Sequence, residues 1–247
     1  MLVVGNWKTY VRTREKAKKL LVAAKRLALG RKIKIVIAPP APYLGLFTAS
    51  RGGVALASQD VSESLDSTET GEVPAPLLKE MGVTYAIIGH SERRARGETD
   101  AQIREKVQRA LVHGITPILC IGESERDADA KYLAHLRTQI TSALSGIPAK
   151  DLLDIVIAYE PIWAIGKSDE DAIQPADLME TVLYIRKVLG DFIPGKGATR
   201  VKILYGGSAE PENARALAGG GGVDGFLVGH ASVDAKMFAG IVKALKQ

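Results

Sequence analysis

Three side chains with different acid–base properties stand just after short apolar runs of the sequence. Glu160 ends the run DIVIAYE, His90 follows TYAIIG, and Lys8 lies two residues beyond LVVGN. A carboxylate, an imidazole and an ammonium group together suit proton transfer on a small anion. We expect Glu160 to act as a general base, although each of the three signals taken alone is equally typical of an ordinary surface or turn residue.

His90 precedes the polar segment SERR, which is typical of a helix start with Ser91 as the N-cap. A helix N-terminus disfavours positive charge, so we expect a neutral imidazole that donates a hydrogen bond to a carbonyl oxygen. Asn6 ends the first apolar run, where its amide could help Lys8 to hold a substrate or could simply satisfy its own turn.

The apolar runs that must position these residues alternate with longer amphipathic segments. Strands are expected at 2–6, 33–38, 54–59, 84–89, 115–121, 154–160, 201–206 and 224–229. Helices are expected at 13–29, 42–50, 74–81, 99–113, 125–145, 175–190, 211–218 and 232–246. Because several strands are apolar on both faces, the succession favours an α/β fold with one domain over residues 1–247, a closed (β/α)8 TIM barrel. An open doubly wound sheet is the alternative.

The last two expected strands end in the small-residue segments YGGS at 205–208 and LVGHAS at 227–232. Backbone N–H groups beside a helix N-terminus form an anion site, and the loops after strands seven and eight of a barrel commonly hold phosphate. We therefore expect a phosphate site here, with a pair of ordinary turns as the alternative.

Composition indicates the class of protein, its location and the kinds of partner to expect. The chain has 247 residues, 46% of them hydrophobic and 25% charged, which is typical of a soluble globular protein. Its single cysteine, Cys120, cannot form an internal disulfide, so a cytoplasmic location is expected. No signal peptide and no membrane-spanning run is recognised. The net charge of +5 comes partly from basic residues at helical spacing without interleaved aromatic residues, which indicates a solvated helix face and no nucleic-acid partner.

Other enzyme classes lack their motifs. The segment GDFIPGKG ends in glycine where a P-loop has Ser or Thr, and it follows an expected helix. No G-x-S-x-G elbow, metal-spaced Cys/His cluster or strand-linked G-x-G-x-x-G occurs. Nucleotidase, hydrolase, metalloenzyme and dinucleotide-binding interpretations are therefore not supported, and no metal or cofactor is expected.

Six segments stand in the order and spacing of a known family: NWK (6–8), GHSERR (89–94), ILCIGE (118–123), AYEPIWAIG (158–166), LYGGS (204–208) and DGFLVG (224–229). Together they closely resemble the triosephosphate isomerase family over essentially the whole chain. The resemblance implies a cofactor-free interconversion of dihydroxyacetone phosphate and glyceraldehyde 3-phosphate through an enediolate. It also implies that Glu160 is the base, His90 the neutral electrophile and Lys8 the electrostatic stabiliser, with Asn6 helping to hold the substrate.

The same resemblance implies where phosphate and lid lie. The residues that would bind substrate or phosphate are Asn6, Lys8, Gly166, Ser208, Gly229 and His230. The residues that would form the lid are Pro161, Ile162, Trp163, Ala164, Ile165, Gly166, Lys167 and Ser168. The first three of these would be the hinge, and Ala164 to Gly166 the tip that meets phosphate.

A further segment, TGEVPAPLLKEMG at 70–82, resembles the third loop of that family and implies a homodimer formed through the 65–75 loop. Glu92, Arg94 and Glu98 match structural polar positions of the family, and Glu92 would lie near the chemistry in a role that the resemblance does not define. Cys120 matches a position close to the base, where a small buried hydrophobic residue is an equally good explanation.

Two departures from the family pattern affect binding. The lid continues as AIGKSDEDA, one residue longer and without the second glycine, which puts its hinge geometry in question. The last phosphate loop has His230 where a second glycine is usual, and we expect its imidazole to add a pH-dependent contribution to phosphate binding. Two other functions stay open: a non-catalytic sugar-phosphate-binding barrel with an altered lid, and a barrel enzyme for a larger phosphorylated substrate.

Overall fold

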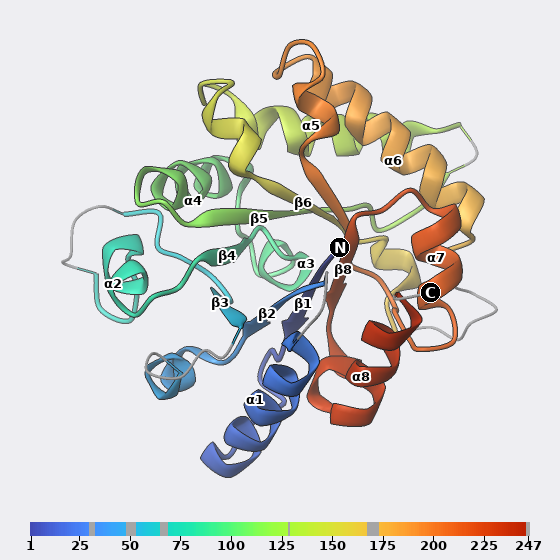
Figure 1. Ribbon diagram of the computed structural model, residues 1–247. Coiled ribbons are helices and arrows are strands. Elements are labelled where there is room, and N and C mark those ends of the chain that lie inside the picture. The colour runs from blue at the N-terminus through green and yellow to red at the C-terminus, as the bar shows by residue number, and fades with distance from the viewer. Residues whose placement is uncertain (30–32, 48–52, 65–68, 128, 167–172, 246–247) are drawn as a thin grey trace.

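The computed structural model describes residues 1–29, 33–47, 53–64, 69–127, 129–166 and 173–245 (Figure 1). Within these residues eight parallel strands close into a barrel in chain order, so the predicted barrel is confirmed and the open sheet is wrong. The strands are β1 Leu2–Asn6, β2 Lys34–Ala38, β3 Val54–Ser58, β4 Tyr85–Ile88, β5 Thr116–Ile121, β6 Val156–Tyr159, β7 Lys202–Tyr205 and β8 Gly225–Val228.

Helices surround the barrel, as Figure 1 shows. The α-helices are α1 Arg14–Ala28, α2 Ala75–Glu80, α3 Ser91–Arg94, α4 Asp100–Val112, α5 Lys131–Leu144, α6 Pro175–Gly190, α7 Ala214–Gly220 and α8 Ala235–Ala244. Short 3-10 helices are η1 Ala41–Leu46, η2 Asp151–Asp154, η3 Ile162–Ala164, η5 Gly197–Thr199 and η6 His230–Val233.

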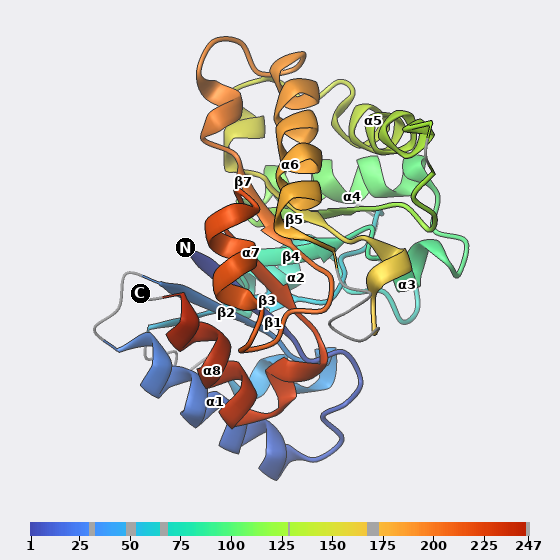
Figure 2. The same cartoon turned by 90° about the vertical axis from the view of Figure 1, so that its right-hand side faces the viewer.

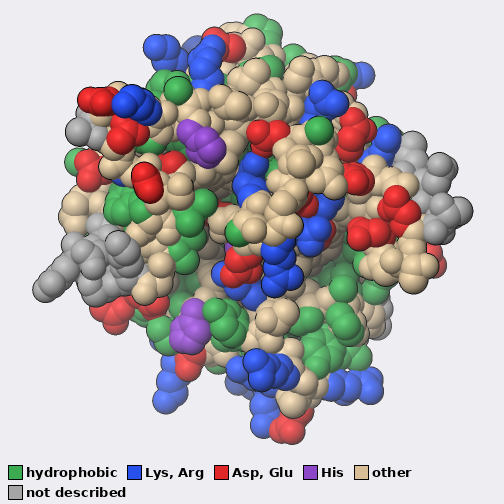
Figure 3. All heavy atoms as spheres, turned by 180° about the vertical axis from the view of Figure 1, so that it is seen from behind, with side chains coloured by type: hydrophobic (Ala, Val, Ile, Leu, Met, Phe, Trp, Pro, Cys, Tyr) green, Lys and Arg blue, Asp and Glu red, His purple; other side chains and the backbone are tan. Residues whose placement is uncertain are grey.

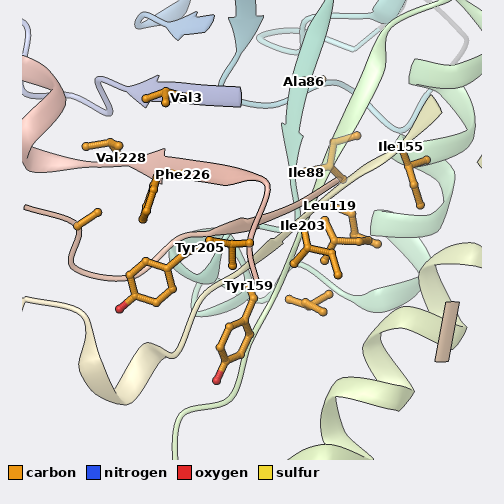
Figure 4. Close-up of a cluster of buried hydrophobic side chains, with 14 of the residues drawn as sticks. Val3, Ala86, Ile88, Leu119, Ile155, Tyr159, Ile203, Tyr205, Phe226 and Val228 are labelled. Atoms are coloured by element: carbon orange, nitrogen blue, oxygen red, sulfur yellow. The ribbon is translucent and has the colours of Figure 1, made fainter. Parts of the chain in front are cut away.

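Strand side chains alternate between two cores, because successive residues of a strand point to opposite faces. In β1, Leu2 and Val4 belong to the cluster inside the barrel, whereas Val3 belongs to the cluster between barrel and helices. Figure 4 shows part of the outer cluster, with side chains from several neighbouring strands. The barrel closes where Leu2 of β1 pairs with Gly225 of β8.

Three predicted helices begin three or more residues later than expected: α5, α8 and α7, the last of which was expected from residue 211 and begins at Ala214. Helix α5 was expected from residue 125, but the carboxylate of Asp127 accepts hydrogen bonds from the backbone N–H groups of Lys131 and Tyr132, at 2.8 and 2.9 Å, and Ala130 has φ of 57°. These contacts make the helix begin at Lys131.

The last predicted helix, 232–246, begins at Ala235 instead. Asp234 is its N-cap and accepts from the N–H groups of Lys236 and Met237, whereas the preceding residues form η6. The short helix predicted at 42–50 is the 3-10 helix η1 as far as residue 46, and residues 48–50 lie outside the described part of the chain.

The C-terminal ends of the strands share one side of the molecule. Figure 2 shows the barrel from the side, with the N-terminus on the left and α3 on the right. Figure 3 shows the face opposite the viewer of Figure 1, where charged side chains gather around a central hollow. All loops that follow the strands meet at this face, so it can collect residues that are distant in the sequence.

Candidate active site

The predicted chemical residues converge at the C-terminal ends of the strands. A cavity of about 410 Å³ is lined by the four predicted catalytic residues and the four predicted phosphate contacts: Asn6, Lys8, His90, Glu160, Gly166, Ser208, Gly229 and His230. Glu160 follows β6 directly, and Asn6 is the last residue of β1. The barrel therefore brings together every residue that the sequence pattern selected for catalysis or for phosphate.

Glu160 is buried, with only 2% of its surface exposed. One carboxylate oxygen accepts a hydrogen bond from the backbone N–H of Ser91 at 2.9 Å, and the other lies 3.2 Å from Nε2 of His90. A methyl group at Gly206 would come within 2.8 Å of Cγ of Glu160. The glycine therefore gives the carboxylate the room it needs.

His90 has its tautomer set by the helix that it begins. Its Nδ1 accepts a hydrogen bond from the backbone N–H of Glu92 at 3.2 Å, so the ring proton of the neutral imidazole lies on Nε2, toward Glu160. His90 is itself the N-cap of α3, and the prediction that Ser91 fills this position is wrong. Ser91 instead donates its N–H to a carboxylate 69 residues away in the chain.

Lys8 is held in an unusual backbone conformation. It is one of two described non-glycine residues with positive φ, at 43°, a region that costs on the order of 1–3 kcal/mol. The Asn6 side chain accepts from its N–H at 3.0 Å, and Gln59 donates to its carbonyl oxygen at 2.9 Å. Gln59 has a supporting role that the sequence pattern did not predict.

The ammonium group of Lys8 lies 2.7 Å from the carboxylate of Glu92. Burial opposes ionisation of this carboxylate, but the hydrogen bond and the charge of Lys8 prevail and lower the pKa of Glu92. Glu92 is thus a partner of Lys8 at the mouth of the cavity, a more specific position than the structural one that the sequence suggested.

The phosphate end of the cavity is formed by small residues and backbone groups. The N–H of Gly166 donates to the Ser208 hydroxyl at 2.9 Å, and this hydroxyl donates to the carbonyl oxygen of Ala164 at 3.3 Å. Gly229 lies beside the Lys8 side chain, since a methyl group there would be 3.6 Å from Cε. His230 follows it as the first residue of η6 and is exposed.

The described part of the predicted lid is fixed to a buried carboxylate. Trp163 donates its indole N–H to Glu123 at 2.8 Å, and the Tyr159 hydroxyl donates to the same oxygen at 2.7 Å. Burial raises the pKa of Glu123, with these two hydrogen bonds opposing the shift. The sequence analysis did not predict this contact, because Glu123 and Trp163 are 40 residues apart in the chain.

Pro161, Ile162 and Ile165 complete the described lid, in which η3 is a single 3-10 turn. Lys167 and Ser168, together with the polar segment in which the sequence departs from the expected lid pattern, lie outside the described residues.

The remaining polar residues of the sequence prediction have structural contacts. Arg94 donates to the carbonyl oxygen of Gly89 at 2.9 Å and forms an ion pair with Asp100. Burial opposes ionisation of Glu98, but hydrogen bonds from Lys106 and Arg93 lower its pKa.

Cys120 is fully buried inside the barrel. Burial, followed by the nearby carboxylate of Glu160, raises the pKa of its thiol well above the ordinary value. A thiol held in its neutral form is a weak nucleophile, so Cys120 contributes packing to the wall behind the carboxylate.

The described parts of the chain contain neither a metal-binding cluster nor a membrane-spanning helix. No group of three or more His, Cys, Asp or Glu side chains in the described parts of the chain is placed to hold a metal ion. None of the helices in those parts is both long enough and apolar enough to cross a membrane.

Comparison with known proteins gives one consistent result. The family model described as triosephosphate isomerase matches residues 1–245. The triosephosphate isomerase of Ralstonia nicotianae is 41% identical over 98% of this chain and 98% of its own length. Those of Moorella thermoacetica and Geobacter metallireducens are 37% and 38% identical, each over 98% of this chain and 97% of their own length.

Proposed function

This chain belongs to the triosephosphate isomerase family, and on that premise we propose how its residues carry out the family's reaction. The protein is an isomerase that interconverts dihydroxyacetone phosphate and glyceraldehyde 3-phosphate. The observation that carries the proposed roles is the buried pair at the reacting end, the carboxylate of Glu160 and the Nε2–H of His90, 3.2 Å apart.

Glu160 is the base that moves the proton. Its carboxylate leaves the N–H of Ser91, takes a proton from the hydroxyl-bearing carbon next to the carbonyl, and returns it to the former carbonyl carbon. The hydroxyl proton passes to the former carbonyl oxygen in the same interval, so that no proton is gained or lost overall. The enclosed position excludes competing water, since only 2% of the residue is exposed. A positioned base of this kind contributes about 100- to 10,000-fold to the rate.

His90 and Lys8 stabilise the enediolate formed between the two proton transfers. Nε2–H of His90 donates to the substrate oxygen as negative charge develops on it, and no reorganisation of the ring is needed because α3 already orients it. Lys8 adds a positive charge, and Asn6 holds both the Lys8 backbone and the substrate.

The phosphate group lies at the other end of the cavity. There the N–H of Gly166 gives up its contact with Ser208, and the hydroxyl of Ser208 gives up its contact with the carbonyl oxygen of Ala164. Both groups then bind phosphate oxygens, together with the N–H groups of Gly229 and His230. The lid, Pro161 to Ser168, covers the bound substrate.

A homodimer is the proposed assembly, formed through the 65–75 loop, of which residues 69–75 are described. A second cavity of about 390 Å³ adjoins the site; Asn6, Lys8 and His90 line both cavities, and Glu92 lines the second one. A loop from a partner subunit in this cavity would support the Lys8 side chain from outside. Light scattering tests this assembly: a particle of twice 26.4 kDa is expected, and a monomer that is fully active would contradict it.

The proposed location is the cytoplasm. The support is the single cysteine of the chain, which is buried inside the barrel and reduced. Cell fractionation followed by immunodetection would check it.

The isomerase roles can be tested by replacing Glu160→Gln. An amide of the same shape cannot accept the proton, so kcat in a coupled assay for glyceraldehyde 3-phosphate should fall by at least about 100-fold. Binding of glycerol 3-phosphate, which has no carbonyl and cannot react, should persist. Retained turnover would contradict the role of Glu160, and a parent protein that binds without turnover would instead support the non-catalytic barrel, which the family comparisons do not favour.

A further inference from the structure

An aromatic pair stands at the phosphate end of the cavity. Tyr10, in the loop between β1 and α1, and His230, at the start of η6, have ring centroids 5.7 Å apart and an interplanar angle of 85°. Both residues line the cavity that contains Lys8 and Ser208. Figure 2 shows the loop after β1 beside the segment that leads into α8, so this contact joins the first and last βα units.

The His230 ring is accessible to solvent and oriented by its neighbour. Tyr10 is 45% exposed and His230 is exposed, whereas His90 is 7% exposed. The only described non-glycine residues with positive φ are Lys8 and Ala130, so His230 occupies this loop without backbone strain. An edge-to-face aromatic contact is worth about 0.5–1.5 kcal/mol, which is enough to favour one orientation of the ring.

The described side chains around the cavity carry little net positive charge with which to bind a phosphate dianion. Among the described side chains that line it, Lys8 is the one permanent cation, and Glu160 and Glu210 are both acidic. Lys8 is already 2.7 Å from a carboxylate of Glu92. A phosphate dianion that enters therefore meets little net positive charge unless His230 is protonated.

The titratable groups around His230 come from several elements. Tyr10 and Lys8 come from β1 and its following loop, and Glu210 comes from the loop after β7. Asp234 lies on the other side, where backbone hydrogen bonds from Met237 and Lys236 lower its pKa and hold its carboxylate at the start of α8. The His230 ring lines the cavity beside these groups, and its ring N–H can donate a hydrogen bond into the cavity.

We propose that His230, oriented by Tyr10, is a phosphate-binding side chain whose protonated imidazole strengthens the binding of phosphate esters in mildly acidic solution. This inference rests on the proposed function only in placing the substrate phosphate at this end of the cavity. It adds Tyr10 to the binding site and gives the chain a pH-dependent affinity that backbone N–H groups cannot provide.

The probe is glycerol 3-phosphate, with its Kd measured by calorimetry near pH 5.5 and near pH 8.5, on either side of the usual titration range of histidine. Comparing parent and variant at the same pH cancels the ionisation of the ligand itself. His230→Gln keeps a polar side chain that never becomes charged, and it should bind about fivefold more weakly than the parent at the lower pH and equally at the higher pH.

Tyr10→Ala should give part of the same loss at the lower pH, and Tyr10→Phe, which keeps the ring contact, should bind like the parent. His113→Gln is the matched control, because His113 lies at the end of α4, where its ring contacts the Arg109 carbonyl oxygen.

If the ratio of the Kd of His230→Gln to the Kd of the parent is the same at both pH values, the inference is overturned. If Tyr10→Ala binds glycerol 3-phosphate with parental affinity at the lower pH, the role of Tyr10 is overturned. Turnover is measured on the same preparations. A parent that binds the probe but does not isomerise triose phosphates contradicts the proposed function and leaves the inference standing, whereas an active parent with parallel pH curves contradicts the inference alone.

Discussion

The two ends of the cavity are constructed differently. The reacting end, defined as Asn6, Lys8, His90 and Glu160, has side chains already fixed by protein hydrogen bonds. The phosphate end is defined as Gly166, Ser208, Gly229 and His230. It consists of backbone groups, the half-buried hydroxyl of Ser208, which contacts Gly166 and Ala164 of the lid, and the exposed side chain of His230.

A rigid geometry is useful at the reacting end, whereas exchangeable contacts are useful at the phosphate end. Donors aimed in advance at a developing charge need no reorganisation during reaction, so the reacting end gains from a fixed geometry. The phosphate end must release and rebind its ligand in each cycle, so contacts that can be exchanged suit it. Substitutions at the reacting end should therefore lower kcat, and substitutions at the phosphate end should raise KM.

The largest effect on catalysis after loss of the base is expected for His90→Asn. The asparagine oxygen can still cap α3, but its side chain is too short to donate where Nε2 does. We expect kcat to fall about 100- to 1,000-fold while the Kd of glycerol 3-phosphate stays within about twofold. His113→Asn is the control, and an equal loss in kcat and in affinity would remove the distinction between the two ends.

Stability of the reacting end should depend strongly on Lys106, which is 4% exposed and contacts both Asp60 and Glu98 beneath α3. Lys106→Met removes one of the two cations that these largely buried carboxylates share, since Arg93 also pairs with both. It should lower the free energy of unfolding by about 2 kcal/mol at neutral pH. Lys79→Met, which removes an exposed hydrogen bond, should change it by less than about 0.5 kcal/mol.

The loss of unfolding free energy in Lys106→Met should depend on pH because the pKa of Glu98 is lowered in the folded protein. Such a group stabilises the fold above its unfolded pKa, and this contribution is lost as pH falls through the folded pKa. The pKa of Asp60 is raised by burial and changes in the opposite sense, so it makes the pH dependence smaller. Urea unfolding should give a smaller difference between parent and Lys106→Met near pH 4 than near pH 7; a difference that grows on acidification would contradict this explanation.

Two matched glycine substitutions compare the ends directly. At Gly206 a methyl group would meet the Glu160 side chain at 2.8 Å, so Gly206→Ala should lower kcat by about tenfold or more through displacement of the base. A methyl group added at Gly166 would meet no described atom within 4 Å, but φ is 74°, so Gly166→Ala strains the lid and should mainly raise KM. Steady-state kinetics of the two variants would refute the comparison if the effects were reversed.

The smallest effect is expected for Ser208→Ala, which removes the hydroxyl that joins Gly166 to Ala164. One neutral hydrogen bond contributes about 1 kcal/mol, so KM should rise about fivefold. Ser145→Ala, at the exposed end of α5, is the control for a serine substitution. A fall in kcat with KM unchanged would place Ser208 at the reacting end.

The sequence was sufficient for the barrel because each strand is a short apolar run, several of them apolar on both faces, followed by an amphipathic segment. β1 and α6 begin and end at the predicted residues. The start of α5 was not predicted, because it depends on how the Asp127 carboxylate folds back to accept the N–H groups of Lys131 and Tyr132. At α8, by contrast, Asp234 was an available capping signal in the sequence.

The positions of the site residues followed from the ends of the strands, but their contacts did not. The N–H of Ser91 is used by Glu160, and this long-range partner is why the usual preference of serine for the N-cap gave the wrong residue. The support of Lys8 by Gln59 and the contact between Tyr10 and His230 likewise join loops that are far apart in sequence. Such contacts depend on the closed barrel and have no local signature.

The central claim is that Glu160 transfers a substrate proton at a fixed reacting end, and exchange with solvent deuterium tests it most directly. Dihydroxyacetone phosphate is incubated in D2O with parent or Glu160→Gln, and deuterium on the carbon skeleton is followed by proton NMR. The parent should introduce deuterium next to the carbonyl as it turns over, and the variant should slow this exchange by at least about 100-fold while still binding glycerol 3-phosphate. Exchange at the parental rate in Glu160→Gln would contradict the account.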